Sequence, residues 1–181
     1  MLTEVGFPVF CVSAFHDASG DINIVVGGGG GASKSGVPNA LLLYRLQPGH
    51  SGICHRKSQL ETVNDAVMAL SAASPNQHTV FAGVGIRTWM VKIVEDKLIL
   101  VSSAQCDHGG AGDPYVRLIS ASGLRMSAAA CDGTVRVWST SGGSKLEEEG
   151  VVVCGGEPDC GSDILLDDDR LLVVVEHKQL M

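Results

Sequence analysis

Short apolar runs separated by turn-forming residues are the feature that most restricts the fold of this chain. The runs either alternate apolar and polar residues or are continuously apolar, and Gly, Asn, Asp or Pro separates them. None combines an apolar residue every three to four positions with capping residues at both ends, as an amphipathic helix does. The pattern therefore predicts an all-β fold with strands at residues 8–15, 22–26, 40–46, 66–72, 79–84, 88–94, 97–103, 115–120, 125–131, 134–139, 145–154, 163–166 and 171–177.

Composition agrees with one globular domain over residues 1–181, because 45% of the residues are hydrophobic and 18% are charged. The 23 glycines suit strands joined by tight turns. A net charge of −7 disfavours a nucleic-acid partner, which needs a basic surface. No apolar stretch approaches the ~20 residues of a transmembrane helix, so we expect no membrane span in this chain and a soluble protein.

Pairs of strands recur along the chain. Similar two-strand units lie at residues 18–46, 76–93, 122–140 and 161–179. Their spacing is irregular but close to the ~40–45 residues of one four-stranded propeller blade. The sequence therefore predicts about four blade-like units.

One segment resembles a WD-repeat blade. Residues 131–140 read CDGTVRVWST, an Asp-Gly turn followed by a β-branched strand that ends in Trp. The resemblance implies that Asp132 and Trp138 are structural residues of a hydrogen-bonded network, although Ala128 and Ala130 occupy the positions where a Ser or Thr is expected. It implies a partial WD40-like β-propeller, with about four blade-like units of a seven-bladed parent.

Five consecutive glycines at 27–31 are followed by Ser33, Lys34 and Ser35. A phosphate-binding loop of the form G-x-x-x-x-G-K-[ST] needs Gly directly before Lys, and it opens a helix. Here Ser33 precedes Lys34, and Pro38 would lie inside that helix at a cost of about 3 kcal/mol. We therefore expect the chain to bind no nucleotide of its own. A flexible surface loop between two strands is the simplest alternative.

The first forty-five residues resemble a particular family of WD-repeat proteins. Its members share a glycine run, a few polar residues that include Lys or Asn, and then Gly, an aliphatic residue and Asn. Residues 27–31, 33–35, Gly36, Val37 and Asn39 match this order, between strands expected at 22–26 and 40–46. The segment is similar to the exchange factors of the endoplasmic reticulum that activate the small GTPase initiating the COPII coat, the prolactin regulatory element-binding protein family.

This resemblance implies a function. The chain would be a guanine-nucleotide exchange factor in ER-to-Golgi transport, acting through an ordered loop, residues 27–39 of the first blade, pressed against the small GTPase. No covalent chemistry is expected. The residues that would contact the GTPase are Lys34, Ser35, Gly36, Val37 and Asn39.

The resemblance also implies a cation and a location. A structural K⁺ would be bound by the backbone carbonyls of Gly28, Gly29, Gly30 and Gly31. The protein would act on the cytosolic face of the endoplasmic reticulum. Because the family has seven blades and a membrane anchor, we expect this chain to be a truncated form. The alternative function is a non-catalytic WD40-like scaffold for protein–protein interaction.

Overall fold

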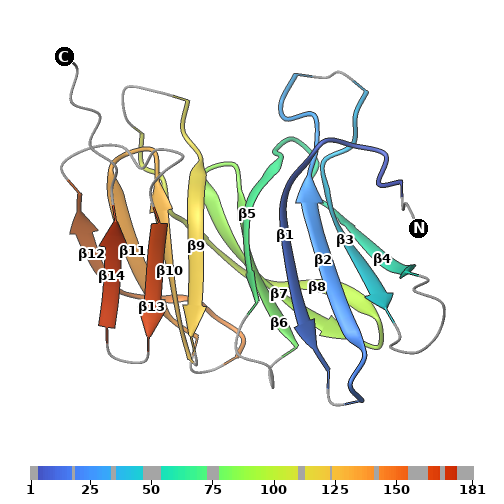
Figure 1. Cartoon of the computed structure of the whole chain (residues 1–181). Helices are drawn as coiled ribbons and strands as arrows, with labels where there is room; N and C mark the ends of the chain where they lie inside the picture. The colour runs from blue at the N-terminus through green and yellow to red at the C-terminus, as the bar shows by residue number, and fades with distance from the viewer. Residues whose placement is uncertain are drawn as a thin grey trace.

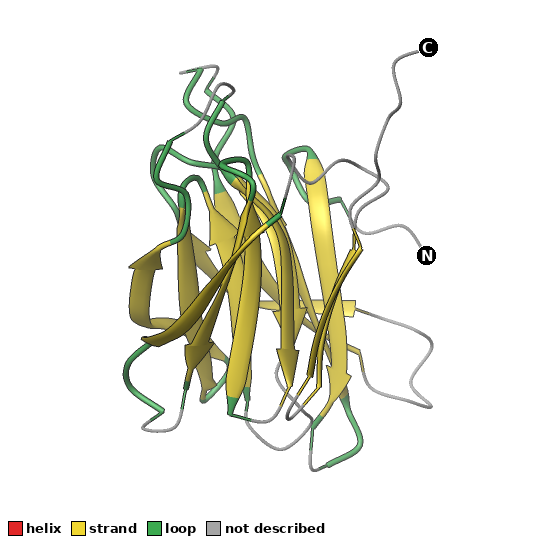
Figure 2. Cartoon of the chain, turned by 90° about the vertical axis from the view of Figure 1, so that its left-hand side faces the viewer, coloured by secondary structure: helices red, strands yellow, loops and turns green. Residues whose placement is uncertain are grey.

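Strands and their connections make up every described part of the chain in the computed structural model, which describes residues 4–17, 19–33, 36–46, 54–72, 78–109, 113–122, 124–140, 143–154, 163–167 and 170–174, the last two ranges as strands only. Fourteen strands lie within these ranges (Figures 1 and 2). No helix in the described ranges is long and apolar enough to cross a membrane. The predicted all-β class is confirmed.

Three sheets have the same topology, four antiparallel strands in sequence order. The first sheet contains β1 (Val9–His16), β2 (Ile22–Gly28), β3 (Ala40–Leu46) and β4 (Cys54–Glu61). The second contains β5 (Val67–Ala72), β6 (Thr79–Val84), β7 (Arg87–Val94) and β8 (Lys97–Gln105). The third contains β9 (Val116–Ser122), β10 (Arg125–Ala130), β11 (Thr134–Ser139) and β12 (Glu147–Val153). Strands β13 (Asp163–Asp167) and β14 (Arg170–Val174) form a two-stranded sheet.

The first strands of consecutive sheets are neighbours. Strand β1 lies beside β5, β5 beside β9, and β9 beside β13, as the foreground of Figure 1 shows. The later strands of each sheet extend away from this row. Each sheet is thus a blade-like unit set against the next by its first strand.

An apolar layer joins the first sheet to the second. Val25 of β2 and Leu43 of β3 belong to the same buried cluster as Val80 of β6 and Val91 of β7, and all four side chains are 0% exposed. The alternation of strand side chains places these residues on facing surfaces of the two sheets.

A second apolar layer joins the second sheet to the third. Phe81 of β6 and Met90 of β7 cluster with Met126 of β10 and Trp138 of β11. Every residue of β6 is buried, because Val80 faces the first sheet and Phe81 faces the third. Such a strand is continuously apolar rather than alternating.

The same backbone hydrogen bond closes one end of each four-stranded sheet. In each case the residue after the second strand donates its N–H to the carbonyl of a residue just before the first strand. These bonds run from Gly29 to Pro8 (3.0 Å), from Gly85 to Ala66 (3.4 Å) and from Cys131 to Tyr115 (3.1 Å).

A second repeated bond joins the residue after the fourth strand to the residue before the third. These bonds run from Thr62 to Asn39 (3.0 Å), from Cys106 to Ile86 (2.9 Å) and from Cys154 to Gly133 (2.8 Å). Together the two sets of bonds show that the sheets are structural repeats with equivalent positions. The predicted two-strand units at 18–46, 76–93 and 122–140 contain the central strand pairs of these repeats.

The thirteen predicted strands are all present, with ends that differ by a few residues, but β4 was not predicted. Its sequence CHRKSQLE is mostly polar, and most of its side chains are exposed. Strand β4 is the outer strand of the first sheet and needs few apolar residues, so it carries almost no hydrophobic pattern. The turns at 16–21, 94–97 and 131–134 lie between paired strands.

Leu43→Ala tests whether the sheets depend on the layer between them. Removing this fully buried side chain should lower the free energy of unfolding by about 2–5 kcal/mol, because a cavity would remain in the layer. Chemical denaturation monitored by circular dichroism would measure the loss. Leu124→Ala is the matched control, since Leu124 is 57% exposed and should lose little stability. Equal effects of the two substitutions would contradict the packing described above.

Candidate functional site

The connection between β2 and β3 is unusually long for this repeat. Eleven residues, 29–39, lie between Gly28 and Ala40, whereas the equivalent connections contain two residues (85–86) and three residues (131–133). The long connection, called here the glycine loop, rises above the ends of β2 and β3 in Figure 1. Since the other two sheets close with tight turns at this point, the glycine loop is an addition to the repeat. Loops added to a rigid scaffold are common functional sites.

Close packing explains why glycines enter the loop. The carbonyl oxygen of Pro8 occupies the space that a Cβ on Gly28 would need. At Gly29 the φ angle is +141°, and a Cβ would overlap the side-chain oxygen of Asn39. Only glycine therefore fits at positions 28 and 29, because any Cβ there would clash with Pro8 or Asn39.

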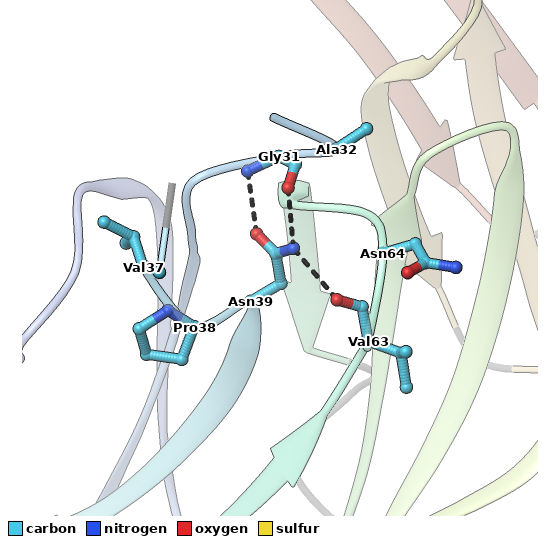
Figure 3. A pocket seen from close by; sticks show the side chains of 8 residues that line it. Gly31, Ala32, Val37, Pro38, Asn39, Val63 and Asn64 are labelled. Carbon is cyan, nitrogen blue, oxygen red and sulfur yellow. Dashed lines mark hydrogen bonds between the residues drawn. The ribbon is translucent and has the colours of Figure 1, made fainter. Parts of the chain in front are cut away.

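The side chain of Asn39 holds the glycine loop in place. Its Oδ1 accepts a hydrogen bond from the Gly31 N–H (2.8 Å), and its Nδ2 donates to the Gly31 carbonyl (3.0 Å) and to the Val63 carbonyl (3.2 Å), as Figure 3 shows. Asn39 is 6% exposed. One buried amide thus ties the loop to itself and to the segment that follows β4. Buried hydrogen bonds of this kind are costly to remove.

Val63 has a strained backbone at the surface. Its φ angle is +61°, a left-handed conformation that β-branched residues rarely adopt, and its side chain is 75% exposed. The Asn39 amide holds its carbonyl, while Thr62 Oγ1 donates to the carbonyl of Asp65 at 2.5 Å within the same turn. Such strain persists only where surrounding contacts maintain it, and it is concentrated at functional sites.

A hollow of about 650 Å³ lies between the glycine loop and the turn after β4. In Figure 3, Val37 and Pro38 lie on one side of Asn39, and Val63 and Asn64 lie on the other. None of the described residues that line the hollow carries a charge. They are Gly31, Ala32, Gly36, Val37, Pro38, Asn39, Val63 and Asn64.

The structure places most, but not all, of the predicted contact residues. Lys34 and Ser35 lie outside the described residues. Gly36 is exposed, Val37 is half-buried, and both line the hollow. The side-chain bonds of Asn39 all point into the protein, so its observed role is to position the loop.

Two of the four carbonyls predicted to bind K⁺ already accept hydrogen bonds from the protein. Ser33 Oγ donates to Gly30 O (2.8 Å), and Asn39 Nδ2 donates to Gly31 O (3.0 Å). The Asn39 amide also bridges Gly31 O and Val63 O, which is the kind of bridge that a cation would otherwise form. Each of these two oxygens keeps a second lone pair, so the hydrogen bonds do not decide whether a cation binds there, and K⁺ stays a prediction. Within the described ranges, no three His, Cys, Asp or Glu side chains form a group that could bind a metal ion.

Val63 and Asn64 were not predicted as site residues. They are more than twenty positions from the glycine loop in the sequence, and only the pairing of β3 with β4 brings the two segments together. A valine that follows an outer strand does not indicate a binding site in the sequence. The left-handed backbone that marks Val63 is a property of the fold.

Asp132 and Trp138 occupy separate places in the third sheet. Trp138 is 1% exposed in the layer between the second and third sheets. Asp132 lies in the turn between β10 and β11, where its carboxylate accepts bonds from Thr134 Oγ1 (2.6 Å), Thr134 N (3.0 Å) and His108 N (3.1 Å). The backbone of His108, rather than its ring, is the partner. Burial opposes charging of Asp132, but these bonds and the Arg136 charge outweigh it and lower its pKa.

The cysteines that face the sheet interfaces are unreactive. Burial raises the pKa of the Cys11 and Cys106 thiols to about 12. Both therefore stay protonated at neutral pH and act as small apolar side chains.

Comparison with known proteins assigns no family to this fold and site. A scan against protein-family models finds no match, and a search of curated proteins finds no significant match. The features that bear on function are therefore the repeat, the glycine loop and the residues around the hollow.

Asn39→Ala tests whether the amide holds the glycine loop. The substitution removes three hydrogen bonds, so the free energy of unfolding should fall by about 1–3 kcal/mol, as measured by chemical denaturation. Amide exchange at Gly31, followed by NMR, should accelerate because its N–H loses its acceptor. Asn64→Ala is the control, since this exposed neighbour should change neither quantity. Slow exchange at Gly31 in Asn39→Ala would contradict the role of the amide.

Thr134→Val should raise the pKa of Asp132 toward its ordinary value of 3.8, because the hydroxyl donor is lost. A carboxylate with a lowered pKa in the folded state stabilises the fold above pH 3.8 and loses this effect as pH falls through the folded pKa. Thr134→Val should therefore be less stable than wild type at pH 6, and the difference should shrink in acid. Denaturation at several pH values would measure it. Thr134→Ser, which keeps the hydroxyl, should follow wild type, and a pH-independent difference for Thr134→Val would contradict this assignment.

Proposed function

We propose that the chain is a guanine-nucleotide exchange factor for the small GTPase that initiates COPII coat assembly, and that the glycine loop is the element that acts on the GTPase. The observation that carries the proposal is the loop itself. It is eleven residues long where the equivalent connections have two and three, and a buried amide holds it in one arrangement. The order of residues within it supports the resemblance to these exchange factors.

We also propose that the sheets belong to a β-propeller. The three sheets and the two-stranded sheet form part of a WD40-like propeller, with β1, β5, β9 and β13 as the innermost strands. Their side-by-side arrangement, the sequential antiparallel order within each sheet, and the repeated hydrogen bonds support this arrangement. The loop would then project from one face of the propeller, as connections between blade strands do.

An exchange factor works by differential binding, since it favours the nucleotide-free state of the GTPase over the GDP-bound state. A loop that is already ordered loses little conformational entropy on binding, so more of its contact energy remains to displace the nucleotide. In this mechanism Gly36 and Val37 contact the GTPase, with Lys34 and Ser35 beside them. Asn39 acts by positioning. A K⁺ ion enters the proposal only through the family resemblance, as does a location on the cytosolic face of the endoplasmic reticulum.

A non-catalytic scaffold is the second candidate function. The face of β1 that points away from β5 exposes Phe10 (49%) and Val12 (61%), and neighbouring Val9 is 48% exposed. An apolar strip of this kind supports contact with another protein surface without any exchange activity.

The chain should accelerate release of fluorescent GDP from the purified GTPase, followed as a decrease in fluorescence. The double variant Val37→Ser/Pro38→Ser keeps Asn39 but removes the apolar side chains of the loop, so we expect at least about a tenfold slower exchange. Val94→Ser is the matched control. Val94 is a 47% exposed valine at the C-terminal end of β7, outside the glycine loop, so this variant should accelerate GDP release as wild type does.

Two outcomes would decide against the proposal. If wild-type protein gave no acceleration, the scaffold would be the remaining candidate. If the double variant kept the wild-type rate while still folding, exchange would not depend on the apolar residues of the glycine loop.

A further inference from the structure

We infer that the hollow beside the glycine loop is a receptor for one uncharged aliphatic side chain of the partner GTPase, and that Val63 forms one wall of it. This inference rests on the proposed function and adds to it a second contact. The glycine loop would approach the nucleotide, and the hollow would bind a side chain on the surface of the GTPase. Val63 and Asn64 belong to no part of the family resemblance.

The chemistry of the lining indicates the occupant. The hollow of about 650 Å³ is large enough to admit an aliphatic side chain, and its described lining has no charged residue. A phosphate or a charged side chain would lose its hydration there without gaining a counter-charge from the described residues, which is costly. Val37, Pro38 and Val63 instead offer apolar surface on both sides of Asn39 (Figure 3). An aliphatic side chain is therefore complementary to this lining.

The strain at Val63 is the second argument. A left-handed φ of +61° suits Gly, Asn or Asp, yet the residue is a valine whose side chain is 75% exposed. In the free protein this valine has a strained backbone, and its side chain buries little apolar surface. Contact with an apolar group of the partner would bury the exposed Val63 side chain and stabilise the complex. Strain maintained by neighbours is a common property of binding sites.

The two walls of the hollow are rigidly joined. Asn39 Nδ2 binds Gly31 O on the loop side and Val63 O on the other side, and Thr62 N donates to Asn39 O (3.0 Å). The hollow is thus formed before any partner arrives. A preformed site requires little ordering when it is occupied.

Val63→Asn separates binding from folding, because the two effects should have opposite signs. Asn adopts a left-handed φ more readily than Val, so the Tm should rise. The aliphatic wall is lost at the same time, so exchange on the GTPase should slow about tenfold or more. Val94→Asn, at an exposed valine with no positive φ, is the control and should not slow exchange. A higher Tm with wild-type exchange would overturn the inference and leave the proposed exchange function intact.

A probe without the GTPase tests the hollow directly. N-acetyl-leucinamide, titrated into the methyl-labelled chain, should give saturable NMR shifts at Val37 and Val63 but not at Val94. N-acetyl-glycinamide, which lacks the side chain, should give none. Saturable shifts with no exchange activity would overturn the proposed function and keep the receptor. Absence of saturable shifts would overturn the receptor, whatever the exchange assay shows.

Discussion

Apolar packing between the sheets is the constraint on which the rest of the structure depends. A single four-stranded sheet cannot bury both of its faces, so each sheet here completes its core with the next one. The second sheet shows this best, because Val80 of β6 faces the first sheet while Phe81 faces the third. Once the sheets are stacked, β1, β5 and β9 become neighbours, and equivalent turns lie at one end of the repeat.

The glycine loop is an insertion into this repeat. The equivalent hydrogen bonds from Gly29, Gly85 and Cys131 define where each sheet would close with a tight turn, and only the first sheet carries extra residues at that point. The scaffold supplies rigid ends, and Asn39 converts a glycine-rich segment into a defined wall beside Val63. Order in this loop therefore comes from one buried amide and from close backbone packing at Gly28 and Gly29.

Strand positions were predictable wherever burial imposes a pattern. Strand β3, buried along most of its length, was predicted with its observed ends, whereas the outer strand β4 was missed because its exposed face requires no apolar residues. For the site, the position of the loop was predictable from the sequence, whereas Asn39 was predicted only as a residue that contacts the GTPase. The direction of the Asn39 side chain was not, because it depends on the Val63 carbonyl, which reaches the loop only through the pairing of β3 with β4.

The sequence by itself determined the all-β class, the central strand pairs, the tight turns and a loop predicted at 27–39, because periodicity and turn residues act over short distances along the chain. The structure shortens this loop to 29–39, since β2 extends to Gly28. Tertiary structure decided which glycines are needed for packing, that Asn39 faces inward, and that Val63 is strained beside the loop. These properties arise from contacts between segments that are far apart in sequence. Local pattern carries no information about such contacts until the sheets are stacked.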